Sequence, residues 1–229
     1  MDVYNLEEQE QIDELRDWWR QHGNLLLNLL LAVFSVLIAW QGWNWYQRRQ
    51  LAQASVIYHS LQDAVQKRDM VRVKAASGEL LEKFGSASYA SLGALMAASA
   101  FAESGDVKTA RAQLKWVADR NKDELRDLAR LRLVALLIDE KLYDEAMKQL
   151  EGSVLPVFDA RFQDTRGDIL KIQGKLDEAR KAYQMALTRL EETRKTSGGL
   201  DLLQDWQIQS DEIYREIVRQ KLDALGGGQ

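Results

Sequence analysis

The sequence has little of what builds a chemical site: its 229 residues include no cysteine, and histidine occurs only as His22 and His59. Without cysteine the chain has no disulfide framework, no thiolate nucleophile and no cysteine-ligated metal. The two histidines lie far apart in the sequence, so a metal site or a histidine-based catalytic triad has almost nothing to be built from. The lack of cysteine fits either side of a membrane and does not settle the compartment.

Patterns typical of β-strands are also scarce. Pro156 is the only proline, and long stretches are rich in Ala, Leu, Glu, Lys, Arg and Gln, which favour helices. Apolar residues make up 46% of the chain and charged residues 29%, so the chain can bury a sizeable core. The composition predicts an all-α protein.

Charge is distributed unevenly along the chain. Residues 1–24 carry seven acidic and two basic side chains, a balance of −5, whereas the whole chain carries −4 and the remainder is therefore close to neutral. No basic patch of the kind that binds a phosphate backbone is visible. We therefore expect no nucleic acid among the partners.

Residues 21–47 contain no acidic or basic side chain. Within them, 25–46 would span about 33 Å as a helix, enough to cross a hydrocarbon core of about 30 Å. Aromatic side chains that prefer the membrane interface flank this stretch. They are Trp18, Trp19, Trp43, Trp45 and Tyr46. The pattern predicts a transmembrane helix at 25–47.

Two other interpretations of this segment fit less well. A cleavable signal peptide needs a basic start and small residues at the cleavage site, whereas here acidic residues precede the span and bulky aromatics follow it. A buried core helix is usually shorter and rarely ends in an aromatic belt. Basic residues near the two ends of the span are almost balanced, with a slight excess after it at Arg48 and Arg49, so charge alone does not orient the chain.

The rest of the chain repeats one pattern of small and apolar residues, at 94–117, 130–150 and 162–187. The alanines Ala110, Ala146 and Ala179 stand 36 and 33 residues apart, close to the period of about 34 of tetratricopeptide repeats. Three aligned units favour such a repeat over a generic antiparallel bundle. A weaker unit is expected before them, with helices over 55–65 and 71–84.

Particular small residues have expected roles in these units. Gly105 and Gly174 are expected to end helices in the left-handed conformation, and Gly167 is expected to let two helices approach closely. A break at 196–199 precedes a final helix over 200–225. We expect this helix to cover the exposed end of the stack with Trp206, Ile213 and Ile217. The expected organisation is an acidic segment at 1–24, the span at 25–47 and a tetratricopeptide-like domain at 48–229.

The segment Tyr4–Asn24, YNLEEQEQIDELRDWWRQHGN, followed by one span and degenerate repeats, resembles the YfgM family of ancillary SecYEG translocon subunits. The resemblance covers essentially the whole chain. It implies an inner-membrane protein with a cytoplasmic N-terminus and a periplasmic repeat domain. It also implies association with SecYEG and with a PpiD-like membrane-anchored periplasmic chaperone, and a role in helping newly exported proteins reach periplasmic chaperones.

The repeat register predicts an inner face that is apolar in two units and charged in the third. The candidate partner-binding residues are Leu92, Leu95, Leu128, Leu131 and Ile138. The charged residues are Arg161, Asp164, Asp168 and Lys171. Such a groove accepts an amphipathic helix or an extended apolar segment. Alternatively the chain fills the groove itself, with 200–225 or the helix around Tyr58 and Leu61. We expect the filled groove, with partner contacts made by the span and the outer rim.

Nothing in the sequence predicts catalysis. Carboxylates lie beside lysines and arginines on helical surfaces, as in 175–180, which is typical of a solvated face. No glycine-rich phosphate loop, nucleophile elbow or metal-ligand cluster is present in the sequence. We expect a protein-binding scaffold that contacts membrane lipid through its span and uses no cofactor, metal or small-molecule substrate. The remaining alternative is a repeat scaffold facing the cytoplasm that assists assembly of another membrane complex.

Overall fold

The computed structural model describes the backbone of residues 4–196 and 204–226, and the regular elements in these ranges are all helices. The predicted all-α class is therefore confirmed. The chain divides into two compact units, residues 1–53 and 54–229. The predicted break at 196–199 lies largely outside the described residues.

The first unit consists of most of α1 (Tyr4–Gln66), a helix that continues without interruption through the predicted span. Large apolar side chains between 29 and 46 are at least half exposed, Ile38 at 70% among them. A continuous apolar surface of this size is unfavourable in water and suits the interior of a bilayer, where a helix satisfies its own backbone. Within the described residues, α1 is the one helix long and apolar enough to cross a membrane.

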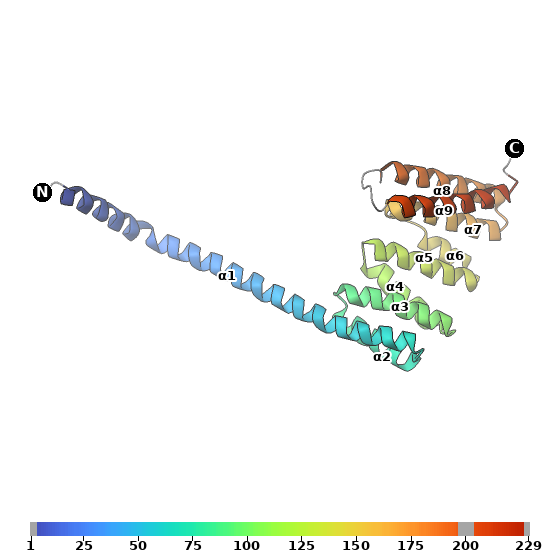
Figure 1. The fold of residues 1–229 in the computed structure, drawn as a ribbon, viewed down its shortest axis with the longest axis horizontal. Coiled ribbons are helices and arrows are strands. Elements are labelled where there is room, and N and C mark those ends of the chain that lie inside the picture. The colour runs from blue at the N-terminus through green and yellow to red at the C-terminus, as the bar shows by residue number, and fades with distance from the viewer. Residues whose placement is uncertain (1–3, 197–203, 227–229) are drawn as a thin grey trace. The chain divides into compact units, whose positions relative to one another are not determined.

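The second unit is a stack of helix pairs, visible in Figure 1 as successive layers from α2 to α9. The end of α1 pairs with α2, α3 with α4, α5 with α6 and α7 with α8, and α9 closes the series. The bounds are α2 (Met70–Phe84), α3 (Ser88–Glu103), α4 (Val107–Arg120), α5 (Glu124–Asp139), α6 (Tyr143–Gln149), α7 (Pro156–Ile172), α8 (Leu176–Thr196) and α9 (Gln204–Asp223). The predicted weak first unit is thus present.

Each pair also packs on the next one. The second helix of a pair contacts the first helix of its successor: α2 packs on α3, α4 on α5, α6 on α7 and α8 on α9. The first helices α3, α5 and α7 touch one another in turn. This nearest-neighbour packing is the arrangement of a helical-repeat solenoid.

The turn inside each pair has the same backbone geometry. One residue takes the left-handed conformation, with φ of 55°, 86°, 61° and 75° at Arg68, Gly105, Lys141 and Gly174. The following N–H donates to the carbonyl five residues earlier, at 2.8 to 2.9 Å in all four turns. This bond pattern is the Schellman ending of a helix. Gly105 and Gly174 confirm the prediction, whereas the left-handed Arg68 and Lys141 were not predicted.

The predicted alanines lie where the two helices of a pair meet. Ala110, Ala146 and Ala179 are completely buried, and so is Val73 at the equivalent position of the first unit. At Gly167 an added Cβ would lie 2.5 Å from the ring of Tyr183. Since real Cβ atoms do not approach a ring so closely, this pair depends on glycine there.

The C-terminal helix packs through a different face from the one predicted. Val218 is completely buried in a cluster with Leu170 and Tyr183, and Tyr214 is partly buried against it. Ile213 and Ile217, expected to cover the stack, are 59% and 45% exposed, so that expectation was wrong. Two apolar stripes run along this helix, and the stripe with Tyr214 is preferred because its hydroxyl also reaches a buried carboxylate. The side chain of Trp206 lies outside the described residues.

Lys141→Gly should raise the free energy of unfolding by about 0.5–1 kcal/mol. A left-handed residue with a Cβ costs roughly 1–2 kcal/mol, and the larger unfolded-state entropy of glycine cancels part of the gain. Urea unfolding of the full chain in detergent, followed by circular dichroism, measures the change. The matched control Gly174→Ala, at the same position of the next pair, should lower the free energy of unfolding by about 1 kcal/mol. A Lys141→Gly variant less stable than its parent would contradict the assigned turn.

Candidate functional site

The inner face is formed by the first helices of the central pairs. Leu92 on α3 is 37% exposed, and Leu128, Leu131 and Ile138 on α5 are half-buried against the core. Small residues between them, Ser99 and Ala135, are exposed. We call Leu92, Ser99, Leu128, Leu131, Ala135 and Ile138 the inner face. It is an apolar strip that the chain covers only partly.

Leu95 is the exception among the five predicted leucine and isoleucine contacts. It is 5% exposed and belongs to the core cluster that also contains Leu133 and Val134 of α5. Arg132 of α5 donates from Nη1 to the Leu95 carbonyl at 3.3 Å. The next unit therefore closes over this position, and Leu95 acts as core. The partner-binding role of the other four stays a prediction.

The charged end of the predicted inner face is occupied by α9. Lys221 Nζ lies 2.8 Å from Asp164 Oδ1 and 2.7 Å from Asp168 Oδ2. Tyr214 donates its hydroxyl to Asp164 at 2.9 Å, and Arg161 stacks on the Tyr214 ring with 5.3 Å to the centroid. Asp164 and Leu95 occupy equivalent positions in their repeats. α9 covers Asp164 in the last unit as α5 covers Leu95.

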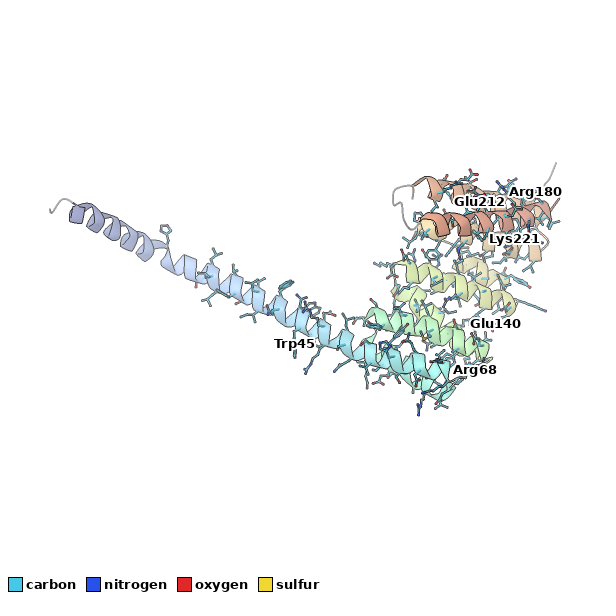
Figure 2. All side chains as sticks on the ribbon, in the orientation of Figure 1. Trp45, Arg68, Glu140, Arg180, Glu212 and Lys221 are labelled. Carbon is cyan, nitrogen blue, oxygen red and sulfur yellow. The ribbon has the colours of Figure 1, made fainter. Side chains whose placement is uncertain are left out.

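A second contact fixes α9 to the last pair. Arg180 of α8 donates from Nη2 to the Leu225 carbonyl at 2.9 Å, just past the end of α9. Figure 2 shows Arg180 and Lys221 at the same end of this pair. The C-terminal helix is held by charge as well as by Val218.

The pKa of Lys221 is shifted by burial and by its contacts with Asp164 and Asp168. Burial alone would lower the pKa of Lys221, but its hydrogen bonds to Asp164 and Asp168 together raise the pKa above the ordinary lysine value. A raised lysine pKa contributes stability below the unfolded value of about 10.4, and this contribution is lost as pH rises through the folded pKa. Lys221 is therefore charged at neutral pH.

The segments expected to fill the inner face pack elsewhere in the described residues. α9 lies against α8 and reaches the carboxylates of α7. On the other side, Leu61 is completely buried with Leu80, and the Tyr58 ring lies 5.4 Å from the Tyr89 ring. The middle of the inner face, around Leu92 and Ala135, is left partly open.

A buried carboxylate that the sequence did not predict joins the third pair to the fourth. Asp127 is completely buried on α5. Arg126 donates to both of its oxygens at 2.8 and 2.9 Å, and Arg130 donates to Oδ1 at 3.1 Å. The backbone N–H of Leu155 donates to Oδ2 at 2.8 Å. Four donors therefore satisfy the two carboxylate oxygens.

Arg130 fixes the connection between α6 and α7 from the same site. Its guanidinium donates to the carbonyls of Gln149 at 2.8 Å and Ser153 at 3.1 Å, and also to that of Glu151. Its charge lies over the Phe162 ring, 4.7 Å from the centroid. The Asp127–Arg130 spacing of three residues was a visible signal, but the loop carbonyls that complete the site were not.

This polar site is structural in character. Burial of the carboxyl would raise the pKa of Asp127, yet the hydrogen bonds from Arg126, Leu155 and Arg130 together lower it below the usual range. A lowered carboxyl pKa contributes stability above the unfolded value of about 3.9, and this contribution is lost as pH falls through the folded pKa. The groups that donate to Asp127 belong to α5 and to the residue before α7, so their hydrogen bonds connect these two helices. The site therefore suits packing rather than proton transfer.

The aromatic side chains at the end of the predicted span are exposed. Trp43 and Trp45 are 63% and 60% exposed, and Arg49 lies over the Trp45 ring at 4.7 Å from the centroid. Figure 2 marks Trp45 on α1. Gln50 donates to the Tyr46 hydroxyl at 2.9 Å. The side chains of Trp18 and Trp19 lie outside the described residues, and the interfacial role of all five stays a prediction.

Four helix pairs in the described residues, a Schellman turn in each, buried alanines at three of the helix crossings and a closing helix define a tetratricopeptide-like repeat protein. This repeat follows an N-terminal helix that meets the requirements for a membrane span. The chain belongs to the tetratricopeptide repeat-like domain family, whose sequence profile matches residues 16–227.

Curated relatives carry one common name. The chain is 28% identical to an ancillary SecYEG translocon subunit of Neisseria gonorrhoeae over 226 residues, which covers 96% of this chain and 98% of the relative. Proteins of the same name from Haemophilus influenzae and Escherichia coli are 28% and 27% identical. Each covers 80% of this chain, and the matches span 90% and 88% of those relatives. The resemblance predicted from the N-terminal segment is confirmed.

Proposed function

We propose that this chain is an ancillary subunit of the Sec translocon, anchored in the inner membrane, that acts by binding other proteins and not by catalysis. The observation that carries the proposal is the extent of the match to a translocon subunit, which spans the apolar helix and the repeats together. The polar groups of Asp127 and Lys221 hold neighbouring helices together, which supports a structural role for both.

The inner face is the surface best suited to a client. Its exposed and half-buried members are apolar or small, and it ends at the last unit, which α9 closes. An extended apolar segment laid along it would cover Leu92, Leu128 and Ile138. Full burial of such a side chain contributes about 1.5–3 kcal/mol, and these are already partly covered, so binding is expected to be weak and transient. Weak binding suits a subunit that passes newly exported chains to a PpiD-like periplasmic chaperone.

The proposed orientation puts the N-terminus in the cytoplasm and the repeats in the periplasm. The family resemblance supports it, while Arg48 and Arg49 after the span oppose it mildly. Arg49 lies over Trp45, so part of this charge is placed at the aromatic belt. The competing function, a cytoplasmic scaffold for assembly of another membrane complex, requires the opposite orientation.

A photo-crosslinking amino acid at Ala135 should capture exported polypeptides in native membranes, because this position lies exposed in the middle of the inner face. The same amino acid at Met185, 46% exposed on α8, is the matched control and should capture none. Affinity purification of the full chain should recover SecYEG in both cases. Failure to recover SecYEG would overturn the translocon assignment, whereas equal capture at both positions would remove the inner face as the client site.

Fusion of alkaline phosphatase after Gln229 should give an active enzyme, because this phosphatase becomes active only where it forms its disulfides, in the periplasm. A green fluorescent protein fusion at the same position is the control and should be dark. A bright fluorescent fusion with an inactive phosphatase would place the repeats in the cytoplasm and favour the assembly-factor function.

A further inference from the structure

Charge is separated along the repeat domain, although the domain as a whole is nearly neutral. Residues 54–122 carry ten basic and seven acidic side chains, a balance of +3. Residues 123–229 carry 17 basic and 21 acidic side chains, a balance of −4. The first two helix pairs are therefore basic and the last two acidic, so the domain has a strong charge asymmetry.

The excess positive charge gathers on one side of α4. Lys108 and Lys115 are exposed and lie seven residues apart on the same helix face, with exposed Ala112 between them. Lys122 follows on this line just beyond the end of the helix and is also exposed. Asp119 is the only acidic residue within α4 itself. Among the ion pairs of the described residues, with nitrogen and oxygen within 4.0 Å, none involves Lys108, Lys115 or Lys122.

Lys74 of α2 extends this positive surface to the first pair. A cleft of about 440 Å³ lies where α2 meets the turn before α4, and its lining includes Lys74, Val71 and Asp106. The charges of Lys74 and Lys108 both act on Asp106, whose pKa is lowered chiefly by its hydrogen bonds with Thr109. Lys74 and Lys108 therefore lie close to each other on the surface.

Val71 is an exposed aliphatic side chain that lines the same cleft as Lys74. Val71 is 82% exposed, more than any other large apolar side chain in the described residues, the span included. Met70 and Ala75 continue the apolar lining of the cleft next to it. Val71 shares this cleft with one lysine, Lys74, and with Asp106. An exposed apolar side chain next to basic residues is a combination that enters the interface of a bilayer with anionic headgroups.

We propose that this basic face, made of Val71, Lys74, Lys108, Lys115 and Lys122, binds anionic phospholipid headgroups of the membrane in which the chain is anchored. The proposal rests on the membrane anchoring in the proposed function, because tethering by the span keeps the domain at high effective concentration near lipid. The acidic half, 123–229, is repelled by the same surface. Lipid binding thus sets which end of the stack faces the membrane and leaves the last two pairs directed away from it.

The absence of cysteine makes the test direct. A single cysteine at Ala112, labelled with a fluorophore, reports proximity to lipids that carry a quencher on the headgroup. The full chain is reconstituted in nanodiscs of phosphatidylcholine, or of phosphatidylcholine mixed equally with phosphatidylglycerol. Quenching is expected in the anionic discs, and it should be lost in high salt and in neutral discs, because the attraction is electrostatic.

Charge-reversal variants separate the basic face from charge in general. Lys108→Glu with Lys115→Glu should abolish quenching in the anionic discs. The matched control, Lys175→Glu with Lys181→Glu, makes the same change in net charge on exposed positions of the last pair and should leave quenching unchanged. Lys108→Gln with Lys115→Gln, which removes charge without reversing it, should give an intermediate loss. Quenching that does not depend on lipid charge, or that survives reversal at Lys108 and Lys115, overturns the proposal.

A second reporter distinguishes failure of this proposal from failure of the anchoring. A cysteine at Gln47, at the end of the predicted span, should be quenched in both kinds of disc. An unquenched label at Gln47 overturns the anchoring and the lipid-facing surface together. A quenched label at Gln47 with no quenching at Ala112 overturns the lipid surface alone. If the Ala112 label is shielded from the lipid quencher only after SecYEG is added, the basic face would be assigned to an acidic protein partner instead.

Discussion

The buried carboxylate of Asp127 joins the third helix pair to the fourth. The seven-residue α6 is too short to offer the next pair the packing surface that α4 offers α5. The connection after it is instead fixed by the Leu155 N–H on Asp127 and by three carbonyls on Arg130. Since α7 begins at Pro156, directly after this site, the positions of α7, α8 and α9 all follow from it. An ion pair buried this fully is costly to break, because each partner would be left without its counter-charge.

This junction also decides which part of the inner face stays open. α7 and α5 must lie side by side for the stack to continue, and the same register position is closed at Leu95 by α5 and at Asp164 by α9. Of the inner-face residues that the structure describes, those around Leu92 and Ala135 keep apolar surface in contact with solvent. A rigid stack with a partly open apolar strip can bind extended chains weakly without unfolding, which is what transfer between a translocon and a chaperone requires.

Sequence periodicity was enough to predict the repeats, because Ala110, Ala146 and Ala179 must be small wherever two helices cross. The glycines likewise predicted the turns at Gly105 and Gly174. Lys141 adopts the same left-handed backbone although it has a Cβ, and residue type alone does not predict this. The register placed Leu95 on the inner face but could not show that the neighbouring unit covers it and makes it part of the core. Asp127 was missed for a related reason: the N–H of Leu155 that it accepts from, and the three carbonyls that Arg130 donates to, are backbone groups of a distant connection. Charge summed over the whole domain concealed the basic first half.

Hydrogen exchange of the full chain with Asp127→Asn tests the central claim most directly. If Asp127 joins the third pair to the fourth, amides of α7, α8 and α9 should exchange faster in the variant, while those of α3 and α4 keep their protection. Asp63→Asn, at an ion pair with Lys67 whose carboxylate is half exposed, is the control and should change neither set. Uniform acceleration across all pairs, or no change in α7 to α9, would contradict the role assigned to this carboxylate.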